Sequence, residues 1–224
     1  MTPAQLTGQT QSHLNDHIVG AQKLEAYPEA GKALVALHKE AKNKGFELAV
    51  ASGFRDYERQ KSIWNAKYSG QRAILDSQSN PIDTSTLSDE EKAVAILRWS
   101  ALPGASRHHW GTDFDVYAKN CLPENTQLQL EPWEYQTDHQ RDFSEWLQEA
   151  MPEFGFFLPY REDLGGVAIE PWHISYLSAA SKNLASLTTE IIREALHLSP
   201  IEGQSAVLPL LDTLYNRFII NVRD

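Results

Sequence analysis

The stretch SRHHWGTDFDVY, residues 106–117, passes from a histidine-rich segment through a glycine turn into an alternating strand. In a strand, successive side chains point to opposite faces, so Asp113 and Asp115 share one face and Phe114 and Val116 share the other. The apolar face predicts packing on a core. The acidic face predicts a cleft that suits a metal ion or a cationic group.

Helical and strand-like patterns are interleaved on both sides of this stretch. The predicted helices run from Pro28 to about Gly45, over Asp56–Tyr68, Lys92–Trp99 and Trp133–Met151, and in a segment after Leu177; the predicted strands are Phe46–Ala51, Phe114–Tyr117, Phe154–Leu158, Val167–Ile174 and Arg217–Val222. This order predicts an α+β fold with a central antiparallel sheet and flanking helices.

The predicted domain organisation is a single domain over residues 1–224, with its motif-bearing core at about 28–180. The remainder, about 181–224, is expected to be a helix/strand extension. We expect this extension to complete the sheet; dimer contacts are the alternative. The oligomeric state does not follow from the sequence.

Composition excludes several classes of protein. The net charge of −10 argues against a nucleic-acid partner, because phosphate binding needs exposed Lys and Arg. No apolar run approaches the length of a membrane-spanning helix, and residues 1–20 contain no apolar signal core. We therefore expect a cytoplasmic chain, or one that acts outside the cytoplasm after export by a signal not seen here. The single cysteine, Cys121, excludes a multi-cysteine zinc site.

A second segment, EPWHISY at residues 170–176, again combines a carboxylate with an imidazole. His108, Asp115 and His173 together offer two nitrogens and one oxygen, and catalytic zinc typically takes three protein ligands plus water. Glu170, three residues before His173, is the natural general base for that water. The sequence thus predicts a hydrolytic zinc site.

A third segment, SGFRDYERQ at residues 52–60, places Arg55 just after a strand-ending glycine turn. A guanidinium there would anchor the terminal carboxylate of a peptide or stabilise an oxyanion. The simpler interpretation of Arg55, without its motif, is a structural salt bridge to Asp56 or Glu58.

The three motifs S-G-F-R-x-x-x-x-Q, S-x-H-x-x-G-x-x-x-D and E-P-W-H resemble, in this order, the D-alanyl-D-alanine carboxypeptidases of the LAS metallopeptidases. That family includes the vancomycin-resistance-type D,D-carboxypeptidases and the L,D-carboxypeptidases that trim peptidoglycan peptides, and its fold occurs in hedgehog domains. The resemblance spans about residues 52–176. It implies zinc on His108, Asp115 and His173, with Glu170 as catalytic base; it also implies substrate-binding roles for Arg55, Gln60 and Ser106, with Trp172 supporting the site.

Two positions depart from the family pattern. Asp113 stands where the family commonly has a small residue, and Ser175 stands where it often has arginine. We expect both to affect substrate choice. Asp113 would contact a substrate amine or a metal ligand, unless it is merely a surface residue. His109, next to the expected ligand, is expected to form hydrogen bonds instead of binding metal.

The predicted function is removal of a C-terminal D-alanine from a peptidoglycan-type peptide. Within the enzymes, the alternatives are an L,D-carboxypeptidase acting on tetrapeptides and an endopeptidase acting on stem peptides. Outside them, the alternative is a hedgehog-like module that binds zinc without turnover, although the intact Glu170 argues against it.

Overall fold

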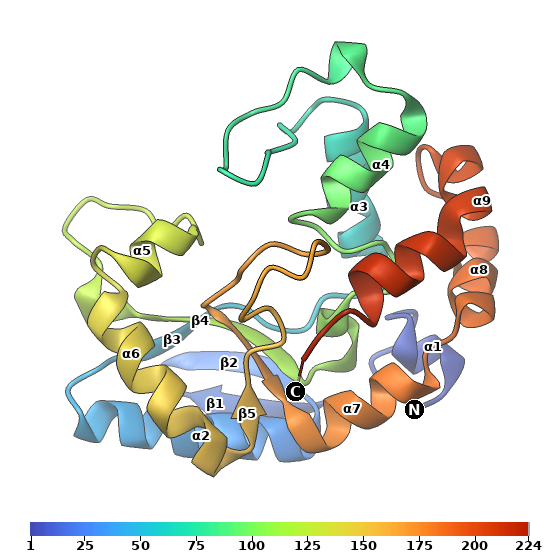
Figure 1. Ribbon diagram of the computed structural model, residues 1–224. Coiled ribbons are helices and arrows are strands. Elements are labelled where there is room, and N and C mark those ends of the chain that lie inside the picture. The colour runs from blue at the N-terminus through green and yellow to red at the C-terminus, as the bar shows by residue number, and fades with distance from the viewer. Residues whose placement is uncertain (224) are drawn as a thin grey trace.

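A four-stranded antiparallel sheet forms the centre of the molecule, and the computed structural model describes residues 1–223 (Figure 1). Its strands, in spatial order, are β3 (Leu48–Ser52), β4 (Asp113–Ala118), β6 (His173–Tyr176) and β5 (Phe156–Phe157). Helices flank this sheet, so the predicted α+β class is confirmed.

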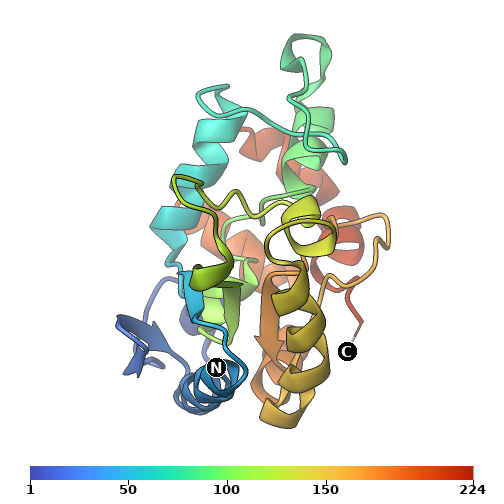
Figure 2. The same ribbon diagram turned by 90° about the vertical axis from the view of Figure 1, so that its left-hand side faces the viewer.

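The apolar face of the sheet packs against α2 (Pro28–Asn43) and α6 (Arg141–Ala150). Pro28 starts α2 at a position where its missing N–H costs nothing, and small and aliphatic residues then recur at helical spacing. Phe114 of β4 is fully buried in this first core, as the alternation of its strand predicts. Figure 2 shows α2 and α6 side by side below and beside the strands.

A second core forms among helices that lie on the other side of the sheet, from the top of Figure 1 (α3, α4) down its right-hand side to α7 at the lower right. These helices are α1 (Pro3–Leu6), α3 (Tyr57–Tyr68), α4 (Asp89–Leu97), α7 (Leu177–Ser186), α8 (Thr189–Leu198) and α9 (Gln204–Leu214). Trp64 of α3, Ile192 of α8 and Leu211 of α9 are fully buried there. The predicted boundary at residue 180 falls inside α7 and therefore does not separate two packing units.

The predicted C-terminal strand over Arg217–Val222 is wrong. Tyr215–Ile219 forms a π-helix that continues α9, and no strand follows β6 within residues 1–223. An apolar run alone does not separate a strand from a buried helical turn, and here Phe218 and Ile219 pack against the helices of the second core. The extension is therefore helical and does not complete the sheet.

One further prediction needed correction, and one structured region had no prediction. The predicted helix over Trp133–Met151 is broken into α5 (Pro132–Gln136) and α6, and in the break Gln140 forms two hydrogen bonds with the backbone of Ala118 in β4. The region 13–26, which gave no clear prediction, is a hairpin of β1 (Asn15–Val19) and β2 (Gln22–Ala26). Neither feature has a local periodic signal, because both depend on partners elsewhere in the chain.

The two strands expected near the end of the core are also shorter than predicted, since β5 covers two residues and β6 begins only at His173. The intervening segment is a loop that returns over the sheet. No helix among the described residues is both long and apolar enough to cross a bilayer.

Candidate metal centre and its cavity

The pairing of β4 with β6 brings the first two candidate ligands together. Asp115 lies directly opposite His173 in the antiparallel register. His108 comes from a 3-10 turn, Arg107–Trp110, that ends at Gly111 in the left-handed conformation. A Cβ on Gly111 would lie 2.4 Å from a methyl carbon of Leu14, so only glycine fits where the turn reverses into β4.

The two imidazoles present one nitrogen each to the same carboxylate. The Nε2 atom of His108 lies 3.4 Å from Asp115 Oδ2, and the Nδ1 atom of His173 lies 3.5 Å from Asp115 Oδ1. The remaining nitrogen of each ring is held from behind: His108 Nδ1 donates to the carbonyl of Gly53 (2.9 Å), and His173 Nε2 donates to Asp113 Oδ1 (3.0 Å). Such outer hydrogen bonds fix the ring orientation of metal-binding histidines.

The arrangement fits a metal ion. One ligand atom from each of His108, Asp115 and His173 lies within 4.8 Å of the others, and all three residues are buried. Oδ1 of Asp115 is buried without a hydrogen-bond partner, an unfavourable state that a cation would relieve. Tetrahedral zinc with ligands at 2.0–2.1 Å separates its donor atoms by about 3.3 Å, close to the two distances above.

The protonation tendencies of the two histidines differ. Burial, reinforced by Arg55, lowers the pKa of His108 to about 4, so this ring is neutral at pH 7 and has a free lone pair. Burial also disfavours charge on His173, but its hydrogen bonds to Asp113 and Glu170 outweigh that cost and raise its pKa to about 9. Loss of the Nδ1 proton would leave that nitrogen with a lone pair that can bind a metal ion.

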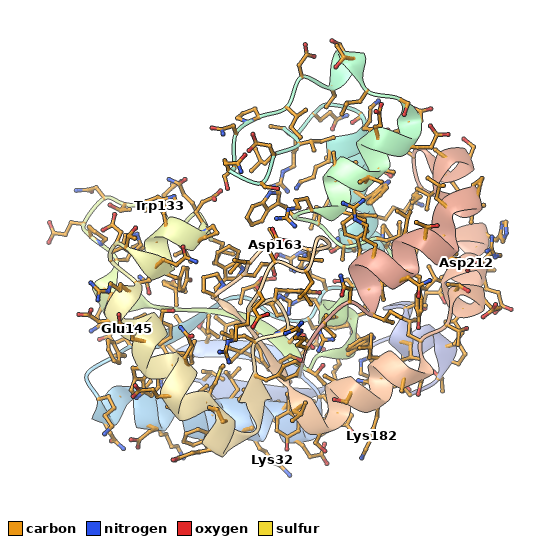
Figure 3. The ribbon with its side chains drawn as sticks, viewed as in Figure 1. Lys32, Trp133, Glu145, Asp163, Lys182 and Asp212 are labelled. Carbon is orange, nitrogen blue, oxygen red and sulfur yellow. The ribbon has the colours of Figure 1, made fainter. Side chains whose placement is uncertain are left out.

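Glu170 lies beside the cluster without belonging to it. Its Oε2 is 3.0 Å from His173 Nδ1, and burial raises the pKa of its carboxyl above the ordinary value, against the hydrogen bond from His173. The loop that carries Glu170 is fixed by an ion pair between Asp163, labelled in Figure 3, and Arg98 at the end of α4. A buried carboxyl with a raised pKa is suited to accept and return a proton near neutrality.

Arg55 follows β3 and reaches the same site. Its NH1 donates to Gln60 Oε1 (3.1 Å), and its NH2 lies 3.8 Å from Asp115 Oδ2. The simpler pairing with Asp56 or Glu58 is absent within residues 1–223: Asp56 instead caps α3 by accepting from the backbone N–H of Arg59. Arg55 therefore points toward the metal cluster.

These residues open onto a cavity of about 390 Å³. Ser106 and Trp172 line it, together with Arg55, Glu170 and His173, as a substrate-binding role would require.

Gln60 and Asp113 do not line this cavity, and both side chains are fully buried. Gln60 holds Arg55 and donates to the carbonyl of Ala101 (2.8 Å). The expectation that Gln60 and Asp113 contact substrate therefore does not fit their placement, which instead suits residues that position Arg55 and His173.

The two departures from the family motifs lie opposite each other in the sheet. Asp113 and Ser175 are cross-strand partners, and Arg107 joins them by donating to Asp113 Oδ1 (2.8 Å) and to Ser175 Oγ (2.7 Å). Burial opposes ionisation of Asp113, but Arg107 and His173 outweigh it and hold the pKa of this carboxyl below its usual range. Both positions lie behind His173, so we now associate them with the metal ligand and not with substrate choice.

His109 forms hydrogen bonds, as expected. Its Nδ1 donates to the carbonyl of Arg55 (2.6 Å), and its Nε2 accepts from the backbone N–H of Gly104 (3.1 Å). This buried ring joins the turn that carries His108 to the loop that carries Arg55.

Two residues of the cavity carried no motif. Tyr160 packs edge-on against His173 with ring centroids 5.1 Å apart, and nothing in the sequence marks it. Lys67 lines the cavity from α3. The sequence marks Lys67 only by its spacing, because it continues the inward stripe of that helix formed by Tyr57, Gln60 and Trp64.

Comparison with known proteins now identifies the family. Residues 23–179 match the family model described as VanY, D-alanyl-D-alanine carboxypeptidase. The chain belongs to the VanY family. This is a family of hydrolytic carboxypeptidases, and the matched region contains all three motifs and the whole cluster.

Relatives of this VanY-family chain include an uncharacterised protein of Haemophilus influenzae, 37% identical over 122 residues that cover 53% of this chain and 93% of that protein. Among solved structures, the LD-carboxypeptidase LdcB, studied for peptidoglycan recognition, is 25% identical with a TM-score of 0.53, over 79% of this chain and 75% of LdcB. VanYB in complex with D-alanine-D-alanine is 22% identical with a TM-score of 0.52, over 83% of this chain and 88% of VanYB, and shares the fold.

Proposed function

We propose that this VanY-family chain is a zinc-dependent carboxypeptidase that removes the C-terminal D-alanine from peptidoglycan-type peptides. The observation that carries the proposal is the position of Glu170, whose carboxylate lies 3.0 Å from a nitrogen of the His108–Asp115–His173 cluster at the wall of a cavity. A base beside a metal site, in a space large enough for a peptide end, favours hydrolysis over zinc binding alone.

His108, Asp115 and His173 would hold the zinc. Two imidazole nitrogens and one carboxylate oxygen favour zinc over magnesium or calcium, which prefer oxygen donors. When bound, zinc supplies a Lewis acid that lowers the pKa of water and polarises a carbonyl.

The chain's own residues would provide the remaining chemistry. Glu170 takes a proton from the attacking water as the oxygen bonds to the scissile carbonyl carbon. It then returns that proton to the leaving amine as the carbon–nitrogen bond breaks. Arg55 either anchors the terminal carboxylate or stabilises the oxyanion, because its guanidinium lines the cavity beside the cluster.

A second candidate is release of D-alanine from a tetrapeptide by an L,D-carboxypeptidase. The similarity to LdcB favours this candidate, whereas the similarity to VanYB, which was solved with D-alanine-D-alanine, favours the D,D-activity. The two activities differ in the length of the peptide that is cleaved and in the stereochemistry of the residue before the scissile bond. Mass spectrometry of products from tetra- and pentapeptide substrates separates them, and internal fragments would indicate the endopeptidase.

The decisive test compares zinc-loaded wild type with Glu170→Ala. Loss of the general base should lower kcat by about 10²- to 10⁴-fold, with zinc binding retained. Glu145→Ala, which removes an exposed glutamate on α6 (Figure 3), is the matched control and should keep full activity. Undiminished turnover by Glu170→Ala would refute the mechanism. Tight zinc binding by wild type without turnover of any stem peptide would favour the non-hydrolytic module.

A further inference from the structure

Lys67 is a buried cation in the wall of the cavity. It lies near the C-terminal end of α3, its exposed fraction is 8%, and it lines the same space as Glu170 and Arg55. Lysine is almost never buried without an acidic partner, because its ammonium group loses hydration that nothing replaces. Such a placement therefore needs an explanation.

In the part of the chain that the structure describes, no acidic or polar side chain lies close enough to Lys67 to bond with it, although Glu170 attracts its charge. Within residues 1–223 its side chain forms no hydrogen bond and no ion pair, while the other lysine that is mostly covered in α3, Lys61, donates to Ser199 Oγ (2.9 Å). Burial lowers the pKa of Lys67 to about 8, with repulsion from Arg72 adding to the effect and attraction to Glu170 opposing it. The group thus remains mostly charged at neutral pH, and it responds to the charge of Glu170.

The neighbouring wall of the cavity is also cationic. Arg59 and Arg72 line it, and in the described part of the chain neither guanidinium pairs with an acid. Arg59, Lys67 and Arg72 thus line one cavity, together with Glu131, in a chain whose net charge is −10. Local positive charge against an acidic background indicates an anionic ligand.

The terminal carboxylate of a substrate does not account for all of these cations. Arg55 already lies beside the metal cluster, 3.8 Å from Asp115, where the reacting end of the peptide must be. One guanidinium satisfies one carboxylate through its bidentate geometry. Lys67 and Arg72 are then left for another anion.

We propose that Lys67, assisted by Arg72, binds a second carboxylate of the peptide substrate, carried by a residue on the acyl side of the scissile bond. The inference rests on the proposed function, and it adds the substrate class: acidic stem peptides in which a glutamyl or diamino-acid residue retains a free carboxylate. Amidation of that carboxylate removes the recognised charge.

The test is a double-mutant cycle between the enzyme and the peptide. The parent is a pentapeptide with free carboxylates on its glutamyl and its diaminopimelyl residue, and each of two derivatives has one of these converted to an amide. Lys67→Met should lower kcat/KM for the parent by about 10- to 100-fold, the usual value of a hydrogen bond to a charged group. For one of the two amides, kcat/KM of the wild type should be lower than for the parent peptide by the same factor. Lys67→Met should cleave that amide as efficiently as it cleaves the parent.

Three controls accompany the cycle. Lys67→Arg keeps the charge and should retain the preference for the parent peptide. Lys182→Met, at an exposed lysine of α7 labelled in Figure 3, should change nothing. Lys67→Met removes an unpaired buried charge, so we expect it to melt no lower than wild type, which separates lost recognition from lost folding.

An equal loss on all three peptides, or no loss on any, would overturn the inference. If wild type cleaves none of them, the proposed function fails, and calorimetric binding of the same peptides to zinc-loaded Glu170→Ala decides the inference separately. The carboxylate site would still be supported if Glu170→Ala/Lys67→Met binds the parent peptide more weakly than Glu170→Ala does, and if this difference disappears with one of the two amides. Absence of that coupling in binding would refute it.

Discussion

At the scale of single residues, both ring nitrogens of His173 have acidic neighbours. One ring nitrogen faces Glu170 and Asp115, and the other is held by Asp113, which is itself held by Arg107. Carboxylate–histidine–metal chains of this kind fix the tautomer and raise the basicity of the ligand. Asp113 therefore acts through His173 and is a positioning residue.

Replacing Asp113 by Asn tests this role. The amide keeps the shape but weakens the hold on His173, so zinc affinity should fall by about 10- to 100-fold. Competition with a zinc chelator measures the affinity, and Asp212→Asn, at an exposed residue of α9 (Figure 3), is the control. A circular dichroism melt verifies folding, since Arg107 loses its buried partner. A folded Asp113→Asn protein with wild-type zinc affinity would contradict the role.

The residues whose proximity in the fold follows the sequence prediction are those with a fixed chemical type at a fixed spacing. His108, Asp115 and His173 are brought together as predicted, and Glu170 lies beside them. Contact of Asp113 with a metal ligand was one of the roles expected, but choosing it over a substrate contact requires the cross-strand register with Ser175 and the turn that aims Arg107. The stripe of α3 places Lys67 on the inward face of that helix, but its lack of a bonded partner is a property of the folded chain.

At the scale of elements, the turn between His108 and β4 determines the metal site. Gly111 has φ 66°, and a Cβ there would also lie 2.9 Å from the backbone nitrogen of Tyr27. The turn is thus pressed against the segment that joins β2 to α2. A side chain at this position would displace His108 relative to Asp115.

Gly111→Ala should therefore destabilise the fold and weaken metal binding together. The left-handed conformation alone costs a non-glycine residue about 1–3 kcal/mol, and the steric overlap adds to this. Gly45→Ala is the matched control: Gly45 has φ 88° but nothing within 4 Å of its Cβ position, so only the conformational cost applies. Chemical denaturation and zinc titration measure both effects. If Gly111→Ala and Gly45→Ala lose the same unfolding free energy and the same zinc affinity, the steric overlap at Gly111 has no cost.

Elements with strong local signals were predicted, and those set by distant partners were not. Helix α2 was predicted from its starting proline and its helical stripe, and β4 from its alternation. The break before α6 depends on Gln140 reaching β4, and the π-helix that replaces the expected C-terminal strand depends on the second core. Local periodicity carries no information about either contact.

At the scale of the whole molecule, the cavity lies where the two cores meet. Trp172 belongs to the core around the sheet, whereas Leu97, Phe218 and Ile219 belong to the helical core, and all four line the cavity. The candidate metal ligands come from the sheet and from the turn beside it, while Lys67 comes from the helical core. The proposed substrate contacts thus come from both cores, and the proposed metal ligands mainly from one.

Removal of bound zinc should lower the unfolding free energy of the whole fold. A ligand that binds only the native state stabilises it by about 3–4 kcal/mol at free concentrations of 100 to 1,000 times its dissociation constant. Without the ion, Asp115 keeps a buried oxygen with no hydrogen-bond partner beside two imidazoles. We expect a chelator to lower Tm in differential scanning calorimetry and zinc to restore it. Magnesium should not restore it, because the site offers two nitrogens.

His108→Ala should abolish the zinc-dependent shift in Tm, whereas His197→Ala, at an exposed histidine of α8, should preserve it. A chelator-insensitive Tm in protein shown to contain zinc would mean that the ion binds outside this cluster.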